Sequence, residues 1–245
     1  MSLAELIEEA PAARFRRTAC GSLWMGLGRG EVSMRRSGAL WLAASATLIV
    51  SDLHLEKGSA YASKGQLLPP YDTKDALDRL DRELMALNPR LLVLLGDSFH
   101  DVRSVSRLAQ EDAHRIAGLA SGRTLLWIVG NHDAEGPGGL PGEIADEIEI
   151  DGLVLRHEPL LGPRPGEVSG HLHPCAKLIH ARRSVRRRAF ATDGERLIVP
   201  AFGSYAGGLN ICDPAYLGLF TAPPTACVLG PSQVHPIPFA ALCGD

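Results

Sequence analysis

The sequence lacks the cysteine arrangements that stabilise small secreted domains or zinc ribbons. Its cysteines are odd in number, scattered and without a Cys-x-x-Cys pair: Cys20, Cys175, Cys212, Cys227 and Cys243. A disulfide framework is therefore not expected. Cys175 follows His173 closely, but we interpret it as a small buried residue and not as a metal ligand.

The sequence also lacks a segment that would insert into a membrane. Its N-terminus carries Glu5, Glu8 and Glu9 where a secretory signal would be basic. No uninterrupted apolar run reaches the roughly 20 residues that a membrane-spanning helix requires. We expect a protein of the reducing cytoplasm without a membrane partner.

A strong excess of one charge is absent as well. The net charge is −3, with 22% charged and 45% hydrophobic residues, which excludes a wholly disordered, collagen-like or coiled-coil chain. A nucleic-acid partner would need a local basic patch, and the candidate is the arginine-rich segment 182–188. The alternative is a solvated loop or a strand edge protected by charge.

Several catalytic motifs are missing. The chain has no Gly-x-Ser-x-Gly elbow and no Walker-type Gly-Lys-Ser/Thr loop. Gly26-Leu27-Gly28-Arg29-Gly30 only approaches a dinucleotide fingerprint and lacks the preceding strand, which favours a turn.

The first half of the chain alternates between strand-like and helix-like patterns. We expect strands over 39–43, 46–50, 91–95 and 124–129, and helices over 72–87 and 105–120. This alternation implies right-handed crossovers and a parallel sheet. In such sheets, ligands bind beyond the carboxyl ends of the strands.

The second half is richer in proline and predicts short, mostly antiparallel strands. Asp151-Gly152 between two apolar segments, 147–150 and 153–155, predicts a hairpin. Further strands are expected over 196–199, 216–221, 226–229 and 234–239.

Four short motifs and one isolated histidine carry metal-binding side chains. In chain order they are Asp52-Leu53-His54, Gly96-Asp97, Gly130-Asn131-His132-Asp133, His157 and Gly170-His171-Leu172-His173. Each of the four motifs follows an apolar run or a glycine, so we expect its side chains where strands end. Together they offer the oxygen and nitrogen donors that two divalent metal ions would need, with Asp97 as the natural bridge.

The charges predict an anionic substrate. Two divalent ions bring four positive charges and meet two carboxylates, Asp52 and Asp97, which leaves about +2. We expect in-line attack on a phosphate ester by a bridging hydroxide held by the two metals. His132 would donate a hydrogen bond or a proton, and Asp133 would orient His132. The alternative for His132 is a further metal ligand.

The ordered motifs resemble the calcineurin-like metallophosphoesterase superfamily. The resemblance implies that Asp52, His54 and His173 bind one ion, that Asn131, His157 and His171 bind the other, and that Asp97 binds both. It also implies an α/β fold, a four-layer αββα sandwich of two mixed β-sheets flanked by helices. We expect a single metallophosphoesterase domain over residues 38–245, with residues 1–37 as an N-terminal extension whose first strand or strands pack on it.

The surrounding residues look similar to the bacterial ligase-associated DNA damage response endonucleases. The similar stretches are 46–58, 96–101, 169–174 and 199–208. The resemblance implies cleavage of DNA with two manganese ions, although the donors also suit iron, zinc, cobalt or nickel. It further implies single-stranded or duplex DNA as partner, together with a repair ligase, helicase or exonuclease. His100, Arg186 and Arg187 are the substrate-binding candidates, while local turn hydrogen bonding is the alternative for His100.

Two other functions remain open from the sequence. A small-molecule phosphodiesterase or nucleotide pyrophosphatase would use the same metal ions. A catalytically dead interaction scaffold would keep the fold without bound metal. The oligomeric state is left open too.

Overall fold

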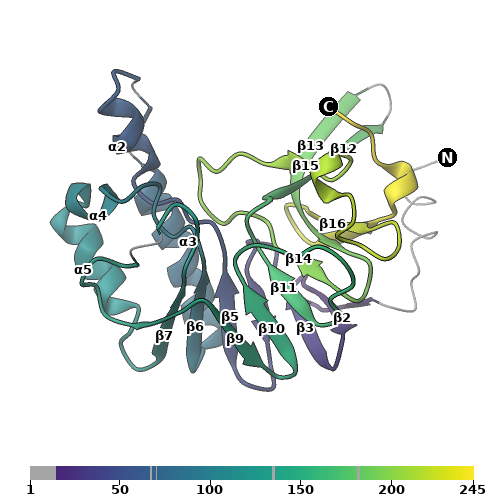
Figure 1. The fold of residues 1–245 in the computed structure, drawn as a ribbon, viewed down its shortest axis with the longest axis horizontal. Helices are drawn as coiled ribbons and strands as arrows, with labels where there is room; N and C mark the ends of the chain where they lie inside the picture. The colour runs from purple at the N-terminus through teal and green to yellow at the C-terminus, as the bar shows by residue number, and fades with distance from the viewer. Residues whose placement is uncertain (1–14, 67, 70, 134–135, 181–182) are drawn as a thin grey trace.

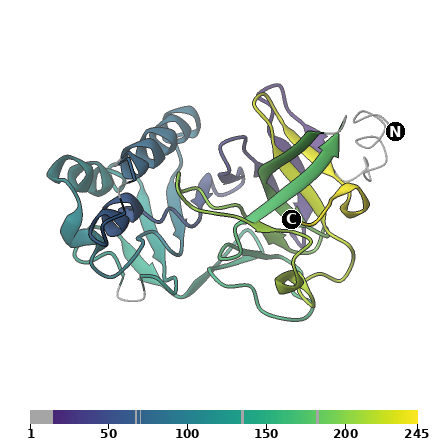
Figure 2. The same cartoon turned by 90° about the horizontal axis from the view of Figure 1, so that it is seen from above.

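The structure is a computed structural model that describes residues 15–66, 68–69, 71–133, 136–180 and 183–245. Arg182 and the N-terminal glutamates named above lie outside these residues. Two mixed β-sheets pack against each other, and the α-helices lie on the outer side of the first sheet (Figures 1 and 2). This confirms the predicted α/β fold with two mixed sheets.

Within the described residues, sheet 1 has eight strands that follow one another in chain order. They are β1 (Arg16–Arg17), β2 (Leu23–Leu27), β3 (Gly30–Met34), β4 (Leu40–Leu42), β5 (Thr47–Val50), β6 (Leu91–Leu95), β7 (Thr124–Ile128) and β8 (Glu143–Ala145). Neighbours from β1 to β5 are antiparallel, and those from β5 to β8 are parallel. The strands expected over 39–50, 91–95 and 124–129 are confirmed to within a residue or two.

The α-helices connect the parallel strands. They are α2 (Lys57–Ala62), α3 (Asp72–Leu87), α4 (Ser104–Arg107) and α5 (Gln110–Gly118). The bounds of α3 are as predicted, and its leucines pack on sheet 1. The single helix expected over 105–120 is wrong, because Leu108 and Ala109 are extended, with ψ of 131° and 145°. Arg107, at the end of α4, donates hydrogen bonds from its side chain to Ser59 and Asp101.

Sheet 2 contains the remaining strands. They are β9 (Glu147–Ile150), β10 (Leu153–Arg156), β11 (Glu167–Ser169), β12 (Pro174–His180), β13 (Arg183–Thr192), β14 (Leu197–Ile198), β15 (Leu209–Asn210), β16 (Thr225–Leu229) and β17 (Val234–Ile237). Their order is β15-β12-β13-β14-β11-β10-β9, and β16 pairs with β13 and β17. The predicted β9–β10 hairpin is confirmed, with positive φ at Asp151 (53°) and Gly152 (74°).

The sequence missed two features of this half. The strand expected over 216–221 is wrong: Asp213 caps a short 3₁₀ helix, η2 (Pro214–Tyr216), and the Tyr216 ring is buried against sheet 2. The long β12–β13 hairpin was not predicted. Between residues 183 and 188, β13 pairs only with β12 among the described residues, so most of the arginine-rich segment lies on an exposed strand edge.

Three apolar layers hold the molecule together. The first fills the space between the sheets, and β2 and β3 contribute fully buried side chains such as Leu23 and Met34 to it. The second lies between sheet 1 and the α-helices. The third covers the outer face of sheet 2 with η2, loops and a second 3₁₀ helix, η3 (Phe239–Ala241). Among the residues that the structure describes, no helix has the length and apolar composition needed to cross a bilayer.

Candidate metal centre

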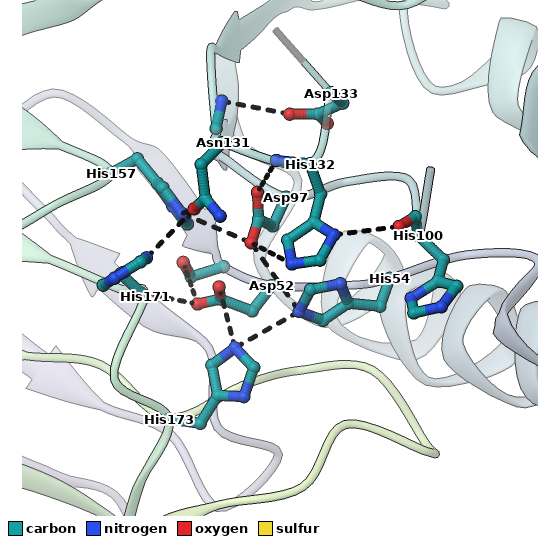
Figure 3. A network of polar contacts seen from close by, with 12 residues as sticks. Asp52, His54, Asp97, His100, Asn131, His132, Asp133, His157, His171 and His173 are labelled. Atoms are coloured by element: carbon teal, nitrogen blue, oxygen red, sulfur yellow. Dashed lines mark hydrogen bonds and ion pairs between the residues drawn. The ribbon is translucent and has the colours of Figure 1, made fainter. Parts of the chain in front are cut away.

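The predicted metal ligands meet where the two sheets come together. Asp52, His54, Asp97 and Asn131 follow the carboxyl ends of the parallel strands β5, β6 and β7, while His157 follows β10 of sheet 2. His171 and His173 lie in the loop between β11 and β12. Figure 3 shows the seven side chains pointing toward one another.

Asp52, His54 and His173 form the first donor group. Nε2 of His173 lies 3.2 Å from Nε2 of His54 and 3.0 Å from Oδ1 of Asp52. Donors about 2.1 Å from a shared cation lie about 3.0–3.4 Å apart, so these spacings suit one metal ion. The imidazoles face each other through nitrogens, and a cation between them would satisfy both lone pairs.

Asn131, His157 and His171 form the second donor group. Oδ1 of Asn131 lies 3.1 Å from Nε2 of His157 and 3.0 Å from Nδ1 of His171. These distances also suit donors that share one metal ion.

Asp97 lies between the two groups. Its Oδ2 atom is 3.4 Å from Nε2 of His157 and 3.8 Å from Nε2 of His54. Its Oδ1 atom accepts a hydrogen bond of 2.9 Å from the backbone N–H of His132. The carboxylate is thus fixed through one oxygen and presents the other to both groups.

Buried groups outside the donor set hold its orientation. Ser51 donates its hydroxyl proton to Oδ2 of Asp52 at 2.6 Å, and the His171 backbone N–H lies 3.1 Å from the same oxygen. Nδ1 of His157 is 3.0 Å from the Leu95 carbonyl oxygen, so that nitrogen carries the proton and Nε2 faces the site.

The backbone is strained at most of these candidate ligands. Five of the seven have positive φ, a conformation that residues with a Cβ atom rarely adopt: Asp52 (53°), His54 (44°), Asp97 (47°), His171 (66°) and His173 (47°). Such strain persists only where the surrounding structure enforces it, and it is concentrated at functional sites.

Two glycines of the sequence motifs permit this close approach. A Cβ atom on Gly130 would lie 2.2 Å from the backbone nitrogen of Asp97. One on Gly170 would lie 1.9 Å from Oγ of Ser51. The glycines that precede Asn131 and His171 are therefore needed for packing, which the sequence indicated only by their position.

The electrostatics favour cation binding. Burial opposes ionisation of Asp52, but the His173 and His157 rings and the Ser51 hydroxyl hold its pKa below the ordinary value. Burial also opposes ionisation of Asp97, but His157 and the His132 backbone lower its pKa to about 2. Burial lowers the pKa of His54 to about 3. Both carboxylates are therefore charged and His54 is neutral at pH 7, the states that bind metals.

His157 is the exception among these groups. Burial lowers its pKa, but contact with Asp97 and the charge of Asp52 raise it to about 9. A metal ion binding at Nε2 would displace a proton from this ring.

The predicted contact between Asp133 and His132 is wrong. Asp133 is buried, and its carboxylate accepts hydrogen bonds from the backbone N–H groups of Ser98, Phe99 and Gly130 at 2.7, 3.3 and 3.0 Å. It therefore ties the Asp97 loop to the Asn131 loop. Nδ1 of His132 lies instead 3.0 Å from the His100 carbonyl oxygen (Figure 3).

His132 and His100 line an open groove of about 400 Å³ over the donors. Their ring centroids are 5.8 Å apart and nearly parallel. Nitrogens of His54, His100 and His132 also lie within 4.8 Å of one another, so the alternative role of His132 as a further metal ligand has a geometric basis too.

The arginine candidates lie beside this groove. Arg186 and Arg187 border a separate pocket of about 190 Å³ that shares Gly207 and Gly208 with the groove. Arg186 donates to the Gly208 carbonyl and pairs with Asp245 at 3.2 Å. Arg187 bonds to the Arg186 carbonyl, and neither arginine contacts the seven donors.

The sequence reasoning missed Lys57, which also lines the groove. The available signal was its place in Asp52-Leu53-His54-Leu55-Glu56-Lys57, three residues beyond a predicted ligand.

Two donor groups around a shared carboxylate, at strand ends between two mixed sheets, are typical of metal-dependent hydrolases. The chain belongs to the calcineurin-like phosphoesterase family, whose model matches residues 46–200 and so includes all seven donors. The protein is therefore a metal-dependent phosphoesterase, as the motif resemblance indicated.

Two solved structures are similar to this chain. The nuclease MPE of Pseudomonas putida shares its fold and is 23% identical, with a TM-score of 0.66 over 88% of this chain and 100% of the nuclease. Yfce, a phosphoesterase from E. coli, is 17% identical, with a TM-score of 0.40 over 77% and 95% of the two chains. A search of curated protein sequences found no match.

Proposed function

We propose that this phosphoesterase cleaves phosphodiester bonds within DNA in bacterial repair, using two divalent metal ions. The observation that carries the proposal is the position of Asp97, whose Oδ2 atom faces both donor groups at 3.4 and 3.8 Å. A carboxylate so placed can be shared between two ions.

The donors sort into two ion sites. Asp52, His54 and His173 would hold one ion, Asn131, His157 and His171 the other, and Asp97 both. Oxygen and imidazole donors without thiolate suit manganese, and also iron, zinc, cobalt or nickel. When bound, the ions supply a water of lowered pKa and neutralise charge on the phosphoryl group.

His132 is placed to act on the substrate. Its Nδ1 atom donates to the His100 carbonyl, so Nε2 is the atom left to face the groove. In the imidazolium form, that nitrogen can donate a hydrogen bond to a phosphoryl oxygen or a proton to the leaving alkoxide. Asp133 supports this indirectly by holding the loops that carry Asp97 and Asn131.

DNA is favoured over a small phosphodiester by the surroundings of the site. The groove is open and adjoins the arginine pocket through Gly207 and Gly208, which suits a chain with several phosphates. The similarity in fold to a protein described as a nuclease supports the same direction. A DNA repair role would place the protein in the cytoplasm, alongside a ligase, helicase or exonuclease.

The test is incubation of the purified protein with circular single-stranded DNA, circular duplex DNA and bis(p-nitrophenyl) phosphate, each with Mn, Mg, Zn or Ni salts. We expect circular DNA to be opened, most readily with manganese. Hydrolysis of bis(p-nitrophenyl) phosphate without DNA cleavage would favour the small-molecule alternative. No hydrolysis and no bound metal would favour the scaffold.

The role of His132 has its own test. His132→Ala should lower turnover by about 10²–10⁴-fold while bound metal, measured by mass spectrometry, stays at the wild-type level. A parallel loss of metal would identify His132 as a ligand instead.

A further inference from the structure

The wall of the groove beside α2 carries a cation that the donor set does not use. Lys57 is the first residue of α2, and its side chain lines the groove with His54, His100 and His132. Within the described part of the chain, its ammonium group makes no hydrogen bond or ion pair. Such a half-buried charge is costly unless a partner meets it.

The carboxylate whose charge acts on Lys57 is Asp72, which is already engaged. Asp72 accepts a hydrogen bond of 2.9 Å from the backbone N–H of Gly58 and is itself buried. Burial lowers the pKa of Lys57, and Asp72 only partly offsets that effect. A group bound in the groove would therefore be the partner of Lys57.

The segment that carries Lys57 is rigidly mounted. The buried carboxylate of Glu56 accepts hydrogen bonds from Thr73 at 2.9 Å and from Ser59 at 2.6 Å, and Arg107 donates to the Ser59 hydroxyl at 3.0 Å. Lys57 therefore starts from a fixed position beside the groove, and little entropy is lost from the backbone when it binds a ligand.

The two sides of the groove differ in the basic side chains that they offer. Lys57 stands on the α2 side, and Arg186 stands beyond Gly207 and Gly208 on the β13 side. In Figure 1, α2 and the β12–β13 hairpin rise on opposite sides of the strand ends. Arg186 is already paired with Asp245 at 3.2 Å, so a phosphodiester chain crossing the donors would meet Lys57 on the α2 side of the reacting phosphate.

We propose that Lys57 binds the phosphate next to the scissile one, on the α2 side, and so makes the enzyme prefer substrates with at least two consecutive phosphodiesters. This inference rests on the proposed phosphodiesterase function and adds a subsite to it. Lys57 is a substrate-positioning residue and takes no part in bond cleavage.

The test compares thymidine dinucleotide, with one phosphate, and thymidine trinucleotide, with two. We expect the wild-type protein to show a kcat/KM about five- to tenfold higher for the trinucleotide, because each lysine–phosphate contact adds a salt-dependent increment of binding. Lys57→Gln should remove most of this preference, while Lys57→Arg should retain it. Lys64→Gln, which removes an exposed lysine just beyond α2, is the matched control and should keep the wild-type preference.

Replacing one phosphate by an uncharged group shows which phosphate Lys57 contacts. Each of the two trinucleotide phosphates is replaced in turn by an uncharged methylphosphonate, and kcat/KM is measured for cleavage at the phosphate that remains. For the wild-type protein, kcat/KM should fall toward the dinucleotide value for one of the two replacements, the one at the phosphate that Lys57 binds. Lys57→Gln should be insensitive to that replacement. In Lys57→Gln, the slope of log kcat/KM against log salt concentration should also be smaller than in the wild type by about one.

Two results would overturn the proposal while leaving the phosphodiesterase function intact. One is an unchanged trinucleotide preference in Lys57→Gln. The other is an equal loss on dinucleotide and trinucleotide, which would place Lys57 at the reacting phosphate or in the scaffold. Failure of the wild-type protein to cleave any phosphodiester would instead overturn the proposed function, and the Lys57 subsite with it.

Discussion

The two halves of the chain contribute different chemistry to the site. The parallel half, β5 to β8, supplies both carboxylates, Asp52 and Asp97, together with the Asn131 amide and one imidazole, His54. From sheet 2 and its loops come only imidazoles: His157, His171 and His173. Both carboxylates of the donor set thus belong to one sheet, and three of its four imidazoles belong to the other.

The two halves are joined at the site by their backbones. Ser51 forms a parallel bridge with Ala201, and its carbonyl accepts a hydrogen bond of 2.8 Å from Phe202. The His171 backbone N–H reaches Asp52 across the same junction. The comparison shows that the centre is complete only when the sheets are docked in register.

The largest effect is expected at the residue shared by both donor groups. Asp97→Asn keeps the shape of the side chain but removes the charge that faces both. We expect turnover to fall on the order of 10²–10³-fold or more, with loss of metal from both sites. Activity assays and metal analysis by mass spectrometry measure the two effects. Full retention of two metal ions in Asp97→Asn would mean that the carboxylate is not shared.

A smaller effect is expected where the halves touch. In Gly170→Ala, the new methyl group would lie 1.9 Å from Oγ of Ser51 and 2.5 Å from Oδ2 of Asp52. We expect a loss of about 1–3 kcal/mol in the free energy of unfolding, and up to about 100-fold in turnover because His171 and Asp52 move apart. Urea denaturation measures the free energy of unfolding, and steady-state kinetics measures turnover.

Gly118→Ala is the control for this change. Gly118 lies in α5, and a Cβ atom added there would meet open space, so alanine should leave activity unchanged and stability unchanged or slightly higher. If Gly170→Ala behaved like Gly118→Ala, tight contact between the halves would not be needed for the site.

The smallest effect is expected in sheet 2, among residues that do not contact the site. Asp193 follows β13, and its carboxylate accepts hydrogen bonds from the backbone of Glu195, Arg196 and Thr221 at 3.0, 3.0 and 2.8 Å. Asp193→Asn should lower the free energy of unfolding by about 1–2 kcal/mol at pH 7. Turnover per bound metal should not change.

The pH dependence of this loss has a defined sign. Burial opposes ionisation of Asp193, but these hydrogen bonds lower its pKa below the ordinary value. The unfolded group titrates at about 3.9, so the stabilisation is fully present above that pH and is lost as pH falls through the lower folded pKa. Denaturation at a series of pH values should show the wild-type advantage shrinking below about pH 4. An advantage that stayed constant there would rule out the charged carboxylate as its cause.

Sequence patterns predicted the parallel half well. The helix Asp72–Leu87 and the strands Leu91–Leu95 and Thr124–Ile128 follow from apolar periodicity because each packs against the same layers along its length. The convergence of the donors was also predictable, since parallel strands end at one edge of their sheet.

The second half resisted prediction because its elements depend on distant partners. Residues 216–221 have strand-like composition, yet the Tyr216 ring is buried against sheet 2 through a 3₁₀ turn. The arginine-rich segment forms a long strand because β12 pairs with it. Asp133 follows the same rule: its backbone partners at Ser98 and Phe99 lie more than 30 residues away.

By itself, the sequence determined the chemical identity of the donors and the strands that carry them, because both are written in local patterns of apolar residues, glycine, aspartate and histidine. Only the tertiary structure decided that Asp97 faces both donor groups, that Asp133 ties two loops and does not contact His132, and that Lys57 lines the groove without an ion-pair partner among the described residues. These relations depend on the distance between side chains that are far apart in the chain, and that distance is set by how the two sheets dock.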